Sequence, residues 1–507
     1  MANPLLFRSL LRDAPLANAS NQQGAAAFAF TPRHKLAQMV MTSCMNETFY
    51  ASGQAQLNDV LATAKDLDDL FLAQLAIYGR ERGMMKDMPA LLTAILAARG
   101  SALLPVVFAR VINNGRMLRN FVQILRSGVT GRRSLGTRPK KLVQRWLQNA
   151  SEERLLQASV GNAPSLADIV KMVHPRPQAA WQEAFFAWLI GKPCDKAQLP
   201  EKTRALLAFR EGDMGAALPD VPFLLLTNAP LSREQWAQLA QRMSWQTLRM
   251  NLNTLARHDV FENATLAASV AQRLADRAQV RSAWSNLQSS VPQVIREALA
   301  QAMEYALENI PPFRGNVVVC PDVSGSMKSS ITGYRKGATS KIRCVDVAGL
   351  IAAAVLRNHP QARVLPFECD VVDVRLDARQ SVMHNAQKLA AVGGGGTNCS
   401  APLRRLLNER ARVDLVIMVS DNESWVDKSR HGSTATMECW IELKKRNPQA
   451  RLVCIDLLPY GTTQAAERSD ILNVGGFSDE VFTVIDNFVN DRYGSAHWLE
   501  EIEAVTL

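Results

Sequence analysis

Acidic residues are missing from one long stretch of the chain. Residues 88–151 contain no aspartate or glutamate, yet they carry eleven lysines and arginines. The excess positive charge lies wholly in the first part: residues 1–308 hold 35 Lys/Arg against 24 Asp/Glu, whereas residues 309–507 hold 23 of each. A run of charge is commonly just a solvated face, but without acids it cannot form mixed surface ion pairs. The pattern favours a nucleic acid partner over an acidic protein or a membrane surface.

Long apolar runs are also scarce. The best membrane-span candidate, Pro89–Val111, is interrupted by Arg99, Gly100 and Arg110, and the N-terminus lacks an apolar secretion segment and carries Asp13. The eight cysteines include no C-x-x-C pair, which indicates reduced thiols, mostly in the core. We therefore expect a cytoplasmic protein.

Strand-like runs are nearly absent between Thr31 and about Asn309, where apolar residues recur at three and four and short turns intervene. This part predicts an all-α, HEAT-like helical repeat over residues 1–309. From residue 310 the pattern changes: NVVVC, ARVLPFEC, DLVIMVS and RLVCIDLLP alternate with helical segments. Residues 310–507 are therefore predicted to form a doubly wound α/β domain with a mostly parallel sheet.

The stretch VVVCPDVSGSM places an acid and two serines directly after the first of these strands. Ligands gather at the carboxyl ends of parallel strands, and hard cations such as Mg²⁺ prefer oxygen ligands. GGGGTNCS adds a hydroxyl, and DLVIMVSDNES ends a second strand in an acid. The predicted ligands of a divalent cation, most simply Mg²⁺, are Asp322, Ser324, Ser326, Thr397 and Asp421. With two carboxylates, binding should be weak until a partner supplies a further ligand.

The competing interpretations of these motifs are a capped turn, a phosphate loop and a metal-dependent hydrolase. Asp and Ser often cap turns by themselves. GGGG is not followed by a lysine and a serine or threonine, so the phosphate-loop pattern fails. No histidine lies near either motif, and His359 and His384 are expected at the surface. We therefore expect no enzymatic activity.

The densest positive run predicts the nucleic acid contacts. Glycines within it allow the chain to approach a phosphate backbone closely. The predicted RNA-binding residues from this run are Arg116, Arg119, Arg126, Arg132, Arg133, Arg138, Lys140, Lys141 and Arg145. Phosphate contacts of this kind give strong binding that weakens with salt.

The ordered motifs resemble known families. Over roughly residues 312–490 the three cation motifs resemble the metal-ion-dependent adhesion site of a von Willebrand factor A domain. YGRERGMMKDMPALL, RRSLGTRPKKLVQRWL and NAPSLADIVKMVHPRP resemble the TROVE module of Ro autoantigen proteins. A TROVE module followed by an A domain is the arrangement of Ro ribonucleoproteins, bacterial members included.

The resemblance implies a ring of helical repeats whose outer surface binds a small noncoding Y RNA and whose hole takes single-stranded 3′ ends of misfolded or damaged RNA. It also implies a role in RNA quality control, degradation or repair, with an exoribonuclease tethered through the RNA. His174 stands where the family has a histidine in contact with Y RNA, and the basic segment precedes Trp146. The stretch LLQASVG before Asn162 lacks the basic residues of animal members, which implies fewer or rearranged contacts.

Two hypotheses follow. The first is a non-enzymatic RNA-binding scaffold, with an A domain that takes an acidic protein ligand. The alternative is a cation-dependent protein-interaction module that works with an ATPase partner and is indifferent to RNA.

Overall fold

The protein divides into two compact units. The computed structural model describes residues 14–212, 218–227, 229–280, 291–334, 342–426, 432–492 and 498–507. Pro89–Ala306 form one unit, which we call the helical unit. Met1–Met88 and Leu307–Thr506 form the other, which we call the A-domain unit. The predicted order, a helical part followed by a doubly wound α/β domain, is confirmed.

Side-chain caps and glycines set the helix ends in the helical unit. Asn114 accepts a hydrogen bond from the backbone of Met117 at the start of one helix, and Ser165 with Asp168 forms a capping box at another. The helices are α4 (Asp87–Arg99), α5 (Leu104–Val111), α6 (Gly115–Ser127), α7 (Thr137–Gln148), α8 (Glu152–Ser159), α9 (Leu166–Val173), α10 (Ala180–Leu189), α11 (Glu201–Glu211), α12 (Arg233–Arg242), α13 (Trp245–Arg257), α14 (Ala264–Leu274) and α15 (Gln293–Ala306). Helix α4 begins at the end of the neighbouring unit.

Helices α6 and α7 are strongly amphipathic, and this turns the basic run outward. Phe121 and Leu125 of α6 and Val143 of α7 are fully buried, while Arg126 and Lys141 are exposed. The apolar stripe of each helix packs on its neighbours, so the charged residues that alternate with it face solvent.

The A-domain unit is built on a five-stranded parallel sheet with strand order β4-β3-β5-β6-β8. The strands are β3 (Val317–Pro321), β4 (Arg363–Val364), β5 (Leu415–Ser420), β6 (Arg451–Asp456) and β8 (Ile471–Gly475). The helices are α16 (Cys344–Asn358), α17 (Val382–Ala390), α18 (Ala401–Asn408), α19 (Ala435–Arg446), α20 (Glu480–Val489) and α21 (Trp498–Glu503). Strands β3 and β5 are buried along their full length, as expected of central parallel strands covered on both faces.

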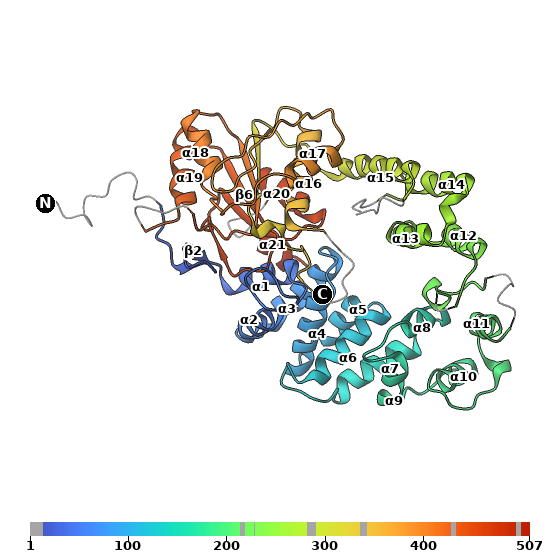
Figure 1. Ribbon diagram of the computed structural model, residues 1–507. Helices are drawn as coiled ribbons and strands as arrows, with labels where there is room; N and C mark the ends of the chain where they lie inside the picture. Colours follow the sequence, from blue (N-terminus) through green and yellow to red (C-terminus); the bar gives the residue numbers. More distant parts are fainter. Residues whose placement is uncertain are drawn as a thin grey trace. The chain divides into compact units, whose positions relative to one another are not determined.

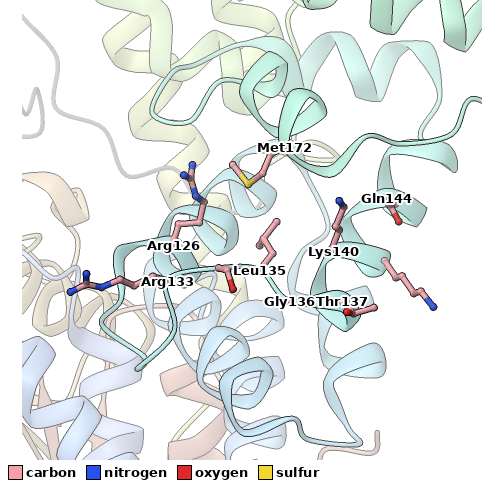
Figure 2. Close-up of a pocket in the computed structure, with 10 residues that line it drawn as sticks. Arg126, Arg133, Leu135, Gly136, Thr137, Lys140, Gln144 and Met172 are labelled. Atoms are coloured by element: carbon pink, nitrogen blue, oxygen red, sulfur yellow. The ribbon is translucent and has the colours of Figure 1, made fainter.

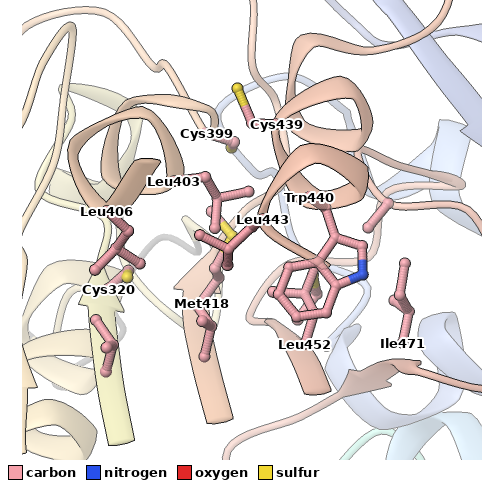
Figure 3. Packing of buried hydrophobic residues seen from close by; sticks show 14 of the residues in the cluster. Cys320, Cys399, Leu403, Leu406, Met418, Cys439, Trp440, Leu443, Leu452 and Ile471 are labelled. Atoms are coloured by element: carbon pink, nitrogen blue, oxygen red, sulfur yellow. The ribbon is translucent and has the colours of Figure 1, made fainter. Parts of the chain in front are cut away.

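Alternate strand residues define the two layers of this core. Cys320, Met418 and Leu452 pack with residues of α18 and α19, including Leu403 and Trp440, as Figure 3 shows. Helix α16 contacts β3 and β5, and α20 contacts β6 and β8. Figure 1 shows these two helices covering the opposite face. The burial of Cys320 within this cluster agrees with its expected role as a core thiol.

The first 88 residues belong with the A domain, which differs from the predicted boundary at 309/310. Their elements are β1 (Ala19–Ser20), β2 (Ala26–Ala29), α1 (Pro32–Thr42), α2 (Gly53–Lys65) and α3 (Asp69–Glu81). Strand β2 pairs with β7 (Thr462–Thr463), where Phe28 is opposite Thr463. The indole of Trp498 in α21 donates to the hydroxyl of Tyr78 over 3.2 Å. These pairings join segments about 400 residues apart, which local patterns in the sequence do not reveal.

No helix in the described ranges is long and apolar enough to span a membrane.

Candidate functional site

The carboxyl ends of β3 and β5 bring the two predicted acidic ligands to one edge of the sheet. Asp322 follows β3, and its backbone N–H donates to Val419 of the adjacent β5 over 2.9 Å. The Asp322 carboxylate accepts from the backbone N–H of Ser324 at 2.8 Å and from the hydroxyl of Ser420 at 2.6 Å. The carboxylate is thus fixed in place, at the position that the strand pattern predicts.

The serines and Asp421 complete a continuous polar cluster. The hydroxyls of Ser324 and Ser326 lie 3.3 Å apart. The Asp421 carboxylate accepts from the backbone N–H of Glu423 at 3.2 Å, and the Ser326 side chain is near enough to act on the pKa of Asp421. All four predicted ligands on these two loops are buried.

Thr397 reaches the same region through the glycine-rich loop. Gly325 donates to the carbonyl of Gly395 over 2.9 Å, and a Cβ at Gly393, which has a φ of 76°, would lie 2.3 Å from the carbonyl oxygen of Val323. Only glycine suits that close approach. Thr397 is buried, and its carbonyl accepts from the backbone of Trp425 at 3.1 Å, so its loop is joined to the one that carries Asp421.

The electrostatics of this cluster suit a cation. Burial raises the pKa of Asp322 to about 7, and the nearby Asp421 adds to the rise. Burial likewise raises the pKa of Asp421, and it raises that of Glu423 to about 8, with Asp421 contributing again. A positive ion would relieve the cost of holding these carboxylates out of water.

Two buried carboxylate oxygens in the cluster have no hydrogen-bond donor among the described residues. Oδ2 of Asp421 and Oε1 of Glu423 accept no hydrogen bond within the described part of the chain. The described residues contain no group of three or more His, Cys, Asp or Glu side chains placed to hold a metal ion. The unpaired carboxylate oxygen of Asp421 and the oxygen-only donors of the predicted set, two carboxylates and three hydroxyls, fit a hard cation.

The second candidate region is the basic surface formed by α6, α7, α9 and the loop between α6 and α7. Three of its arginines donate hydrogen bonds to backbone carbonyls of the protein. Arg119 donates to the carbonyl of Ala158 at 2.7 Å. Arg132 donates to the carbonyl of Ala97 at 3.0 Å, and Arg138 donates to that of Gly100, also at 3.0 Å. These guanidinium groups hold α4 and α8 in place, which explains their presence without RNA.

The other six basic residues of the run are exposed or half-buried. Arg116, Arg126, Arg133, Lys140, Lys141 and Arg145 form no ion pair with any residue that the structure describes. Lys140 is half-buried and the other five are exposed. Their side chains thus form no direct ion pair there, although Arg126 is near enough to Asp168 to help lower the pKa of that carboxyl.

Four of these six residues surround one pocket of about 640 Å³, shown in Figure 2. Its lining comprises Arg126, Arg133, Ser134, Leu135, Gly136, Thr137, Lys140, Lys141, Gln144 and Met172. The view shows Leu135 and Met172 between the side chains of Arg126 and Lys140. Helix α7 begins beside it at Thr137, and no side chain caps its first turn. The pocket therefore combines cations and hydroxyls with a small apolar floor, beside a helix start that no side chain caps.

His174 lies beside this surface at the end of α9. It is exposed and has a left-handed backbone with a φ of 50°. The side-chain amide of Gln144 donates to the carbonyl of Val173 over 2.6 Å and to that of His174 over 3.3 Å, which ties the end of α9 to α7.

The comparisons with known proteins agree with this geometry. Residues 316–489 match the family model described as the Ro60 vWA domain. The RNA-binding protein RO60 of Deinococcus radiodurans is 23% identical over 518 aligned positions, covering 92% of this chain and 94% of the relative. The crystal structure of the Deinococcus radiodurans RO (RSR) protein matches with a TM-score of 0.60 and 21% identity, over 91% of this chain and all of that one. The chain is Ro-like.

A more distant relative matches a smaller part. The RNA-binding protein RO60 of Caenorhabditis elegans is 22% identical over 204 residues, which is 39% of this chain and 30% of the relative. The resemblance to Ro proteins expected from the motifs is thus confirmed, and with it the von Willebrand A domain.

In this Ro-like chain the structure adds residues that the sequence did not single out. Glu423 is a third buried carboxylate beside the cation motifs, and its only signal was its place two residues after Asp421. Gln144 and Met172 line the basic pocket although neither carries charge. Trp146, the aromatic that follows the basic segment, is buried and donates to Ile112 over 2.9 Å, so it supports the fold.

Proposed function

We propose that this Ro-like protein is an RNA-binding scaffold without enzymatic activity, which holds RNA on the basic surface of α6, α7 and α9. The observation that carries the proposal is the group of Arg126, Arg133, Lys140 and Lys141 around one pocket, with no ion pair to any described residue. The names of two relatives, which describe RNA-binding proteins, support it.

The chemistry of the pocket suits a phosphate backbone. Lysine and arginine side chains displace the counterions of a polyanion, and this gives affinity without base recognition. In the first turn of α7, which no side chain caps, the backbone N–H groups of Thr137 and Arg138 have no partner within the helix and can donate to a phosphate oxygen. Leu135 and Met172 provide an apolar surface against which an unpaired base can lie.

The finer parts of the proposal come from the resemblance. We infer that the bound RNAs are a small noncoding Y-type RNA and single-stranded 3′ ends of misfolded or damaged RNA. In this proposal the protein acts in the cytoplasm in RNA quality control, degradation or repair. The bound RNA would tether an exoribonuclease to the protein. His174, exposed beside the pocket, is a candidate contact to the Y-type RNA.

The experiment is a salt titration of RNA affinity. The double variant Lys140→Gln, Lys141→Gln removes two positive charges at the pocket. We expect its log-log salt slope to be smaller than that of the wild type by about 1.5, because each phosphate contact contributes about 0.7–0.9. Affinity should fall at least tenfold at low salt.

The matched control is Lys388→Gln, Arg404→Gln, which removes the same charge from exposed positions on α17 and α18. Its slope and affinity should equal those of the wild type. If both double variants behave alike, the RNA is held elsewhere or only by net charge, and the proposed surface is wrong.

A second role is supported at the A domain by the buried, incompletely bonded carboxylates. We propose that Asp322, Ser324, Ser326, Thr397 and Asp421 hold a divalent cation, most simply Mg²⁺. When bound, the ion would offer an open coordination position to a carboxylate of a protein partner. An alternative function for this domain is cation-dependent binding of a partner that is an ATPase. Equal Mg²⁺ affinity in the wild type and in Asp421→Asn would contradict this role.

A further inference from the structure

A half-exposed tryptophan follows the second acidic motif of the A domain. Trp425 comes four residues after Asp421, in the stretch that continues from β5. Residues 421–424 are all buried, whereas Trp425 is 45% exposed. Tryptophan is among the residues that most often carry the binding energy of a protein interface. We therefore examined what holds this side chain in place.

The backbone of Trp425 is tied to the loop that carries Thr397, one of the five predicted cation ligands. The N–H groups of Trp425 and Val426 both donate to the carbonyl of Thr397, over 3.1 and 3.2 Å. The hydroxyl of Ser424 accepts from the backbone N–H of Cys399 at 3.0 Å, which joins the same two loops again. The start of the tryptophan side chain is thus fixed relative to the candidate cation site.

The indole ring itself lies against Gly396, the residue before Thr397. A Cβ at Gly396 would stand 2.7 Å from Cζ2 of Trp425 and 3.1 Å from Cη2. Those two atoms belong to the six-membered ring, so the ring takes the space that any other residue at 396 would need for its side chain. The exposed part of Trp425 therefore belongs to a supported ring, which loses little conformational freedom when a partner covers it.

Lys328 places a positive charge at the same glycine-rich loop. Its ammonium donates to the carbonyl of Gly393 over 3.4 Å, and a Cβ at Gly394 would stand 2.5 Å from its Nζ. The side chain is exposed and forms no ion pair within the described ranges of the chain. Glu368 also contacts the loop, where its carboxylate accepts from the backbone N–H of Gly395 at 2.7 Å. The loop before Thr397 thus carries an ammonium that can attract a negatively charged partner.

The two side chains make different demands on a partner. The ammonium and a bound cation both favour a carboxylate, whereas the exposed indole favours an apolar or aromatic surface. Aromatic rings in contact gain energy beyond the apolar area that they bury, because the edge of one ring is attracted to the face of the other. A carboxylate with an aromatic ring close to it satisfies both demands.

We propose that Trp425 selects the protein partner of the A domain, by packing against an aromatic side chain that stands next to the partner's cation-binding carboxylate. The inference rests on the second role proposed above. It names the class of ligand, which is a peptide segment in which an acidic residue neighbours an aromatic one. The cation binds the carboxylate, Lys328 attracts its charge, and the indole packs on the aromatic ring.

The test is calorimetric titration of the full chain, at saturating Mg²⁺, with the capped dipeptides acetyl-Asp-Phe-amide and acetyl-Asp-Ala-amide. We expect the wild type to bind the Phe peptide on the order of fivefold more tightly than the Ala peptide. Trp425→Ala should abolish this preference and bind the Ala peptide as the wild type does. Trp425→Leu keeps an apolar side chain against Gly396 and should retain part of the preference. Lys328→Gln should weaken both peptides equally, because they carry the same charge.

Leu70→Ala is the matched control, because it removes an exposed apolar side chain from α3 of the same unit. It should keep the preference for the Phe peptide, and thermal unfolding should show every variant folded. A preference that persists in Trp425→Ala, or that is missing from a wild type that binds both peptides, would overturn the role of Trp425 alone. Failure of both peptides to bind the wild type, or equal binding in Mg²⁺ and in EDTA, would overturn the cation role together with it.

Discussion

His359 shows how the end of a helix decides the role of one side chain. The sequence pattern placed it at the surface, but it follows the last residue of α16 and is only partly exposed. Its Nε2 accepts the backbone N–H of Phe313 over 2.9 Å, and the two rings stack with centroids 5.4 Å apart. A neutral imidazole is required for that hydrogen bond, because protonation removes the acceptor.

This contact predicts a pH dependence of stability. Burial lowers the pKa of His359 below its ordinary 6.5, partly offset by a hydrogen bond to Pro311. The unfolded chain then binds more protons in that range, so the stabilisation is present above pH 6.5 and is lost as pH falls through the folded-state pKa. In urea denaturation, His359→Phe should lower the free energy of unfolding by about 1 kcal/mol at pH 8. A difference from wild type that stays constant down to pH 5 would contradict this role.

Sequence reasoning correctly predicted that Asp322 and Asp421 lie at one edge of the sheet, because strand ends and residue order are local information. Asp322 and Asp421 each follow an apolar strand, and adjacent parallel strands end at one edge of a sheet. The hydrogen bond between Tyr50 and Tyr460 was not predictable in this way, since the two residues are 410 positions apart and carry no motif. Glu423 is an intermediate case, because its spacing was visible but its burial was not.

At the scale of elements, the adjacent residues Arg132 and Arg133, in the loop before α7, have different structural roles. Arg132 caps the carbonyl of Ala97 near the end of α4, whereas Arg133 lines the pocket. The sequence predicted both as RNA contacts, because charge density does not reveal which carbonyls a guanidinium meets after folding. The structure separates positions that support the surface from positions that are free to bind.

This difference predicts opposite effects of two adjacent substitutions. Arg132→Ala should lower the free energy of unfolding by about 1–2 kcal/mol, because it leaves a helix-end carbonyl without its charged donor. Arg133→Ala should change stability by less than about 0.5 kcal/mol and should instead weaken RNA binding. Chemical denaturation and RNA titration of both variants check the pair. Equal losses of stability would show that the assignment is wrong.

At the scale of the whole molecule, the two periodicities predicted the two kinds of architecture but not the grouping of the chain. The change from helical to strand patterns near residue 310 corresponds closely to Leu307, where the chain returns to the A-domain unit. The first 88 residues belong to that unit too, because β2 adds to β7 and Tyr78 meets Trp498. Such pairings depend on contacts between distant segments, which a single sequence does not show.

The same grouping links the two proposed roles in one chain. Asn46 and Tyr50 precede the helical unit in sequence, yet their hydrogen bonds go to Thr332 and Tyr460 of the A domain. The net charge follows the same division, because the excess of lysine and arginine over acids lies in the helical unit. The two roles that we propose, RNA binding and cation-dependent partner binding, thus fall on separate compact units.

The central claim is that the pocket of α6, α7 and α9 holds RNA. The most direct measurement is sequencing of RNA crosslinked in cells to the wild type and to a variant with Lys140, Lys141 and Arg145 all changed to glutamine. We predict that the wild type recovers one abundant, structured small RNA and that this RNA is lost from the variant. Recovery of the same RNA by both proteins, or of no RNA above background by the wild type, would contradict the account.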